Sequence, residues 1–191
     1  DRMRPMAIAW HASAVLRAGD LEAAAGLVAD AMSAAASFPV GDQYSPFIAY
    51  LRAELANERG DSNAAELTTA AIDWVDRLGY ASWRDQLRIQ EARVAARSGN
   101  LDAALPALDA LSNDEPSMLA EAASWLLRTS VLASFEPGVE RVRQLASALD
   151  HDAGEQYVRL VRREIDATLA ALGGASVAPI SAIAEEWERG G

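Results

Sequence analysis

A six-residue string recurs three times in this chain and constrains its fold more than any other feature. The copies are Gly19-Asp20-Leu21-Glu22-Ala23-Ala24, Gly60-Asp61-Ser62-Asn63-Ala64-Ala65 and Gly99-Asn100-Leu101-Asp102-Ala103-Ala104. Gly60 follows Gly19 by 41 residues and Gly99 follows Gly60 by 39. A recurrence of this length is typical of helical repeat arrays, in which each copy is one supersecondary unit. The string therefore predicts a series of similar helical hairpins.

The residues of the string explain why a hairpin forms there. Glycine readily adopts the left-handed conformation that ends a helix. The residue after it, which is Asp20, Asp61 or Asn100, can accept a hydrogen bond from the free amides that open the next helix. The two alanines that end each string have little side-chain bulk, so the paired helices can approach closely.

The rest of the chain also reads as helix. Alanine, the best helix former, occurs 42 times in 191 residues, and the alternation typical of strands is absent. Proline and glycine signals divide the chain into ten predicted helices. In the first half they lie at about 5–18, 21–37 and 46–58, followed by a helix from Gly60-Asp61 to about Leu78. In the second half they lie at about 83–98, 101–111 and 117–134, then from Glu136-Pro137, and then at 153–172 and 178–189. We expect Ser82 to cap the helix at 83–98, and the segments 38–41 and 113–116 to break their helices. The predicted fold is all-α, one domain over 1–191 with five repeats at about 5–40, 45–80, 82–116, 117–150 and 153–190.

The charge excludes several classes of partner. The formal net charge is −11 and the sequence pI is about 4.6, so phosphate backbones and anionic lipids are repelled. We therefore predict no nucleic-acid partner and no membrane association. There is no cysteine, which fits a cytoplasmic protein and excludes thiolate chemistry. The chain begins at Asp1, from which we expect a piece of a longer protein, with a cloning remnant as the alternative.

The turn and its surroundings resemble the tetratricopeptide repeat. Small residues lie eight positions before the turn Asp or Asn, at Ala12, Ala53 and Ala92, and four positions after it, at Ala24, Ala65 and Ala104. The period near 40 is similar to the longer variant in bacterial transcriptional regulators of the maltose-activator type. This resemblance covers about 6–116 by motif and the remainder by spacing. It implies a right-handed α-solenoid that binds proteins or peptides.

The same resemblance implies a binding groove on the first helix of each hairpin. By position, the groove residues are Phe47, Tyr50, Glu54, Asn57, Glu58, Ile89, Arg93, Arg97 and Arg128. Arg93 and Arg97 share one helix face, and a row of arginines could clamp a carboxylate or a phosphorylated segment. The alternative, which we favour, is that these arginines pair with neighbouring carboxylates on a solvated face.

Other candidate residues indicate structure rather than chemistry. The five tryptophans, Trp10, Trp74, Trp83, Trp125 and Trp187, are expected to pack between helices, and Trp74, Tyr80 and Trp83 to join the second repeat to the third. His11 and His151 lie in different repeats, and the acid pairs Asp150/Asp152 and Glu185/Glu186 are expected to be solvated, with Asp152 as a helix cap. A helix-turn-helix likeness at 169–183 lacks the basic and amide side chains that read bases. We predict no catalytic residue, no metal site and no cofactor.

These observations predict a non-enzymatic protein- or peptide-binding module. We expect it to be the sensory or scaffolding part of a larger bacterial transcriptional regulator. The alternative is a small-molecule effector domain with a pocket between the first helices of the hairpins. Homo-oligomerisation stays open.

Overall fold

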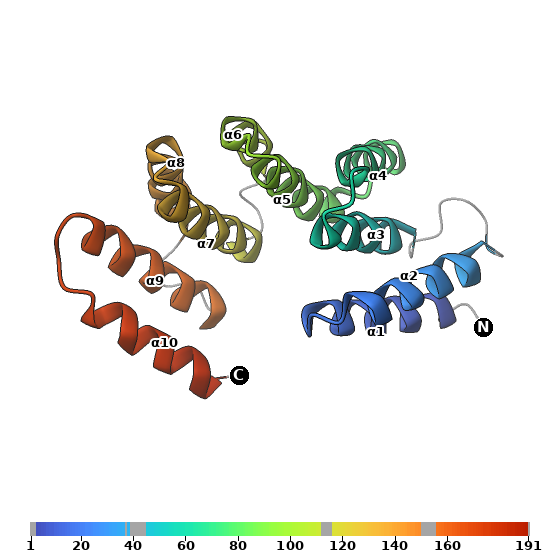
Figure 1. Cartoon of the computed structure of the whole chain (residues 1–191), viewed down its shortest axis with the longest axis horizontal. Coiled ribbons are helices and arrows are strands. Elements are labelled where there is room, and N and C mark those ends of the chain that lie inside the picture. The colour runs from blue at the N-terminus through green and yellow to red at the C-terminus, as the bar shows by residue number, and fades with distance from the viewer. Residues whose placement is uncertain (1–2, 37, 39–44, 112–115, 150–155, 191) are drawn as a thin grey trace. The chain divides into compact units, whose positions relative to one another are not determined.

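The computed structural model describes residues 3–36, 38, 45–111, 116–149 and 156–190. Within these ranges the chain forms ten α-helices and no strand, which confirms the all-α prediction (Figure 1). The helices divide into two compact units, Asp1–Ala110 and Leu111–Gly191, and each is described here by itself. The continuity of one array across both units stays a prediction.

The first unit consists of three consecutive helical hairpins. They pair α1 (Arg4–Arg17) with α2 (Leu21–Ala35), α3 (Ser45–Arg59) with α4 (Ala64–Leu78), and α5 (Ala81–Arg97) with α6 (Leu101–Asp109). Each hairpin also packs on the next, because α3 contacts both α1 and α2, while α5 contacts both α3 and α4. Each first helix after α1 therefore lies against both helices of the preceding hairpin.

Glycines make the three corners of this unit. Gly19, Gly60 and Gly99 have φ angles of 84°, 72° and 79°, in the left-handed region. The amide of Gly19 donates to Leu16 O (3.0 Å) and that of Asp20 donates to Val15 O (3.2 Å). This pair of bonds is the Schellman motif, and the same pair recurs at Gly60 and Gly99. The recurrent string thus corresponds to one backbone turn used three times.

Buried alanines hold the paired helices together at each corner. On the first helices Ala12, Ala53 and Ala92 are each 0% exposed. On the second helices the buried positions are Ala24, Ala64 and Ala104, at 0%, 6% and 0% exposure. The expectation of a buried alanine at residue 65 is wrong, because Ala65 is exposed and its neighbour takes the contact.

The displacement in the second hairpin has a local cause. Asp20 and Asn100 cap their helices, accepting from the amides of Ala23 (3.0 Å) and Ala103 (3.2 Å). Asp61 was expected to do the same but does not, because α4 begins only at Ala64 and has Asn63 in the cap position. Ser82 is also not a cap, since α5 already begins at Ala81.

The second unit contains α7 (Pro116–Ala133), α8 (Glu136–Ala148), α9 (Gln156–Leu172) and α10 (Ala178–Gly190). Here α7 packs against α8 and α9, and α9 packs against α10. The turn string is lost in this half of the sequence, yet the corner between α7 and α8 keeps the Schellman bonds with Ser134 at φ 52°. The same backbone turn therefore also forms at a corner that has no glycine at the left-handed position.

Some expectations lie outside the described residues. These are the helix break at 39–41, the closing segment 113–115, His151, and the acids Asp150 and Asp152. Among the helices that are described, none is both long and apolar enough to cross a bilayer.

Candidate functional site

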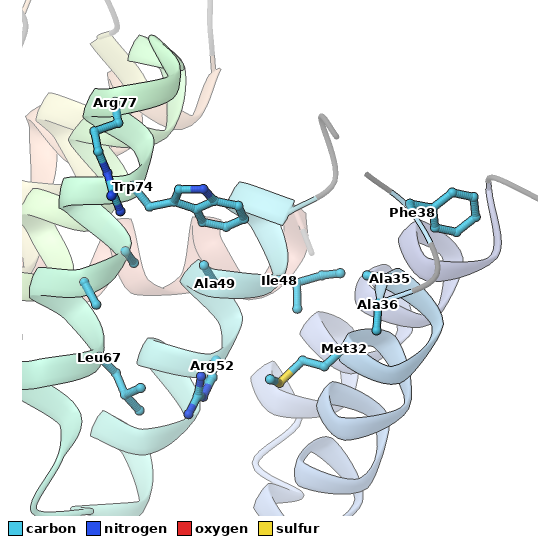
Figure 2. Close-up of a pocket in the computed structure, with 12 residues that line it drawn as sticks. Met32, Ala35, Ala36, Phe38, Ile48, Ala49, Arg52, Leu67, Trp74 and Arg77 are labelled. Atoms are coloured by element: carbon cyan, nitrogen blue, oxygen red, sulfur yellow. The ribbon is translucent and has the colours of Figure 1, made fainter. Parts of the chain in front are cut away.

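A groove in the first unit lies over α3, with α2 and α4 on either side (Figure 2). Its volume is about 480 Å³, within the range of roughly 300–1,000 Å³ usual for ligand pockets. It is an open hollow whose lining is largely apolar. The lining residues are Met32, Ala35, Ala36, Phe38, Ile48, Ala49, Arg52, Leu67, Ala70, Ala71, Trp74 and Arg77.

Helical periodicity explains why these residues converge. Leu67, Ala70, Ala71 and Trp74 follow the spacing of one face of α4, and α2 presents Met32 with Ala35 and Ala36 by the same rule. Five of the twelve lining residues are alanines, whose small side chains leave the space between the two helices unfilled. The hollow is thus a product of alanine-rich helix faces set beside larger apolar residues.

Trp74 is the largest side chain in the groove. Figure 2 shows its indole extending from α4 across Ala49 toward Ile48 on α3. It is half-buried, as is Phe38 beyond the end of α2. Met32, 39% exposed, faces Ile48 from the other side. Flexible methionine and flat aromatic rings adapt to varied apolar surfaces, which suits a binding site.

Two arginines supply the polar groups of the groove. Arg52 comes from α3 and Arg77 from the last turn of α4, and both are exposed. Nε of Arg77 donates to Asp73 O of its own helix (3.2 Å). Neither guanidinium forms an ion pair with any described residue, and none of the described lining residues is acidic. The groove is therefore a locally positive hollow in a chain of net charge −11.

Three residues predicted to line the binding groove are buried instead. Phe47, Asn57 and Ile89 are 4%, 3% and 1% exposed. Little of their surface is open to a ligand, and the contact predicted for them stays a prediction.

Phe47 belongs to an aromatic row that links three hairpins. Its ring centroid lies 4.8 Å from that of Trp10 on α1 and 5.2 Å from that of Trp83 on α5. Tyr50 extends the row, 6.2 Å from Trp83. The packing expected of these tryptophans is thus present, although Trp10 remains 58% exposed. Trp74 departs from the expected cluster with Tyr80 and Trp83, because it faces the groove.

The remaining predicted residues lie at partly exposed positions. Tyr50 and Glu54 are half-buried on α3, and Arg93 is half-buried on α5. Arg97 pairs with Glu58 (3.4 Å), which joins α5 to α3. Arg128 lies in the second unit and pairs with Glu164 (2.9 Å). The favoured alternative, pairing with neighbouring carboxylates, therefore holds for Arg97 and Arg128.

Only some of the histidine and acid candidates lie within the described ranges. His11 is an exposed residue of α1, and Glu186 pairs with Arg163 (2.7 Å). Across the residues that the structure describes, no three of His, Asp and Glu are grouped to hold a metal ion.

Comparison with protein-family models, with curated proteins and with solved structures gives no match for this chain. The likeness to the tetratricopeptide repeat consequently stays a prediction.

Sequence reasoning placed the site on the first helices and missed this groove. One signal could have found it. Apolar residues of α4 occupy two faces, since Ile72 and Val75 are in the core while Leu67 and Trp74 are not fully buried. A surface helix needs one apolar stripe, so a second stripe indicates a second contact.

Proposed function

We propose that this chain is a non-enzymatic binding module that captures a segment of another protein in the α2–α3–α4 groove. The single observation that carries the proposal is the groove itself, an apolar hollow of about 480 Å³ bordered by Arg52 and Arg77. Apolar anchors with a few polar groups at the edge are the usual composition of a recognition site.

The stacked hairpins support the same proposal. Helical repeat arrays present extended surfaces to protein partners, and the glycine corners recur at the spacing of such arrays. We extend the proposal to a right-handed solenoid that acts as the sensory or scaffolding part of a larger bacterial transcriptional regulator. This extension rests on the resemblance to the tetratricopeptide repeat, not on the groove.

The proposal can be tested by selecting binders from a displayed random-peptide library, with the whole chain as the target. We expect selected peptides to lose at least tenfold in affinity for the Ala70→Gln variant, because the amide occupies the apolar hollow. Ala70 is exposed, so the substitution leaves the core intact. Ala65→Gln is the matched control, an exposed alanine of the same helix outside the groove. Equal affinity for both variants, or no selected peptide at all, would overturn the proposal.

A small-molecule effector is the second candidate, because the groove volume is also that of small-ligand pockets. The groove differs from the pocket first envisaged, since its two sides are the second helices of their hairpins. Dodecanoate, which has an apolar chain and one carboxylate, is a suitable probe. Saturable binding of dodecanoate that is lost in Ala70→Gln, together with a failed peptide selection, would favour this candidate.

A further inference from the structure

We propose that the segment held in the α2–α3–α4 groove is an acidic amphipathic α-helix of a partner protein. This inference rests on the proposed function and names the chemistry of the partner. Three features of the groove carry it: its charge, its small-residue lining and its length.

Charge complementarity indicates that the partner segment is negatively charged. Arg52 and Arg77 lack ion pairs with the described residues, whereas arginines elsewhere on the same unit, such as Arg84 with Asp76 and Arg97 with Glu58, are paired. A guanidinium beside an apolar surface binds a carboxylate by charge-assisted hydrogen bonds. Since the chain carries 28 acidic and 17 basic residues, a basic partner would be attracted to most of the surface, but an acidic one only to places like this groove.

The lining favours a helix over an extended segment. Recognition of an extended peptide as an added strand needs an exposed sheet edge, and the described part of the chain contains no strand. A helix laid into a groove needs small residues beneath it and larger apolar residues at its sides. Alanines of all three helices line the hollow, with Met32 on one side and Trp74 on the other.

The dimensions fit several helical turns. On α4 the lining runs from Leu67 to Arg77, ten residues, so this side of the groove is about 15 Å long at 1.5 Å per residue. Figure 2 shows Arg52 at the level of Leu67 and the guanidinium of Arg77 beside Trp74, as its bond to Asp73 O requires. Leu67 and Trp74 are seven residues apart on α4, so the two cations lie about two helical turns apart along the groove. A bound helix would therefore place acidic residues about seven positions apart, with apolar residues between them.

A fluorescently labelled synthetic helix tests this inference. The probe is an 18-residue alanine-based peptide with Leu at four positions of one face and with two Glu residues seven positions apart beside that face. Two control probes have the same sequence with Gln or with Lys in place of each Glu. We expect the Glu probe to bind the whole chain at least tenfold more tightly than the Gln probe, and the Lys probe to bind most weakly. The affinity of the Glu probe should fall as salt is added.

Variants of the protein locate the binding. We expect Arg52→Gln and Arg77→Gln each to weaken the Glu probe about fivefold and the double variant about 20-fold, with the Gln probe unaffected. The matched control is Arg59→Gln with Arg84→Gln, which changes the net charge equally at two ion-paired arginines of the same unit. Neither arginine lines the groove, so the control should bind as the unaltered chain does.

Each outcome decides between the two proposals. Equal binding of the Glu and Gln probes, or an unchanged affinity in the double arginine variant, overturns the acidic helix. If the Glu probe fails while selected peptides still depend on Ala70, the groove binds peptides of another kind. If the peptide selection itself fails, the proposed function falls and this inference falls with it. Binding of dodecanoate without any probe helix overturns the inference in favour of a small ligand.

Discussion

The α1–α2 corner of the first unit and the α7–α8 corner of the second have the same backbone turn built from different residues. At the first, the amides of Gly19 and Asp20 donate to Leu16 O and Val15 O. At the other, Ser134 N donates to Val131 O (3.3 Å) and Phe135 N donates to Ser130 O (2.8 Å). One corner has a glycine in the left-handed conformation and a capping aspartate, whereas the other has a serine there and no side-chain cap.

Near the second corner, a glycine lies where the two helices meet instead of at the turn. Gly138 lies on α8, and a Cβ atom added to it would collide with Ser130 Oγ and lie 2.6 Å from Phe135 Cδ1. In the first unit the corresponding close contacts are made by alanines such as Ala24, which is 0% exposed. A hairpin therefore has two separate requirements, a residue that can adopt the left-handed turn and a small residue where the helices touch. Glycine can satisfy either one.

The largest effect is expected from enlarging the contact residues of the first unit. We predict that Ala24→Leu, Ala64→Leu and Ala104→Leu each lower the free energy of unfolding by about 3 kcal/mol, because there is no space for three more carbons. Amide hydrogen exchange within the altered hairpin measures this locally. The exposed Ala65→Leu should change it by less than about 0.5 kcal/mol. A large loss of stability in Ala65→Leu would mean that residue 65, and not residue 64, faces the partner helix.

The corresponding contact in the second unit is tighter but needs a smaller change to break it. Gly138→Ala should destabilise the α7–α8 hairpin by about 2 kcal/mol, because the new Cβ overlaps Ser130 Oγ. That hydroxyl is buried without a hydrogen-bond partner in the described structure, so Ser130→Ala alone should cost little.

Combining Gly138→Ala with Ser130→Ala gives a double-mutant cycle, read by urea denaturation and by hydrogen exchange in α7 and α8. We expect the double variant to recover part of the lost stability, since the closest overlap is removed. Strictly additive effects would show that the contact between α7 and α8 is looser than described.

These two contacts also show how far the sequence alone can lead. The corners at Gly19, Gly60 and Gly99 could be predicted, because a left-handed residue has few alternatives to glycine. The corner at Ser134 could not, since serine rarely adopts the left-handed conformation and so does not signal it. The shift from Ala65 to Ala64 was equally hidden, because adjacent alanines look alike until the start of α4 is known.

The binding groove was harder to predict for a related reason. Its lining comes from three helices, and none of its residues has a chemical signature. The resemblance placed Phe47 in the groove by position, yet packing against Trp10 and Trp83 buries it. Which aromatic side chain faces the core and which faces solvent depends on the contacts between hairpins, and a single-helix pattern does not contain them.

A smaller effect is expected from the caps, which also distinguish the corners. Asp20→Ala should lower the free energy of unfolding by about 1 kcal/mol, because the amide of Ala23 loses its acceptor. Asp61→Ala should cost less than half as much, since Asp61 makes only a long ion pair with Arg59 (3.8 Å) and does not cap α4. Chemical denaturation of the two variants in parallel makes the test. Equal losses would indicate that the second corner is capped like the first.

The smallest effect is a gain, and it tests the comparison most directly. Ser134→Gly should raise the stability of the α7–α8 hairpin by about 0.5 kcal/mol. A side chain at φ 52° carries a steric cost that glycine avoids, although the greater freedom of glycine in the unfolded chain offsets part of the gain. The reverse substitution, Gly19→Ser, should cost stability at the first corner, where an added Cβ would meet no atom within 4 Å and only the backbone conformation matters. Protection of the amides of α7 and α8 from hydrogen exchange shows whether Ser134→Gly stabilises or destabilises its hairpin. If Ser134→Gly is destabilising, the serine must contribute an interaction of its own, and the two corners would then be alike in backbone geometry only.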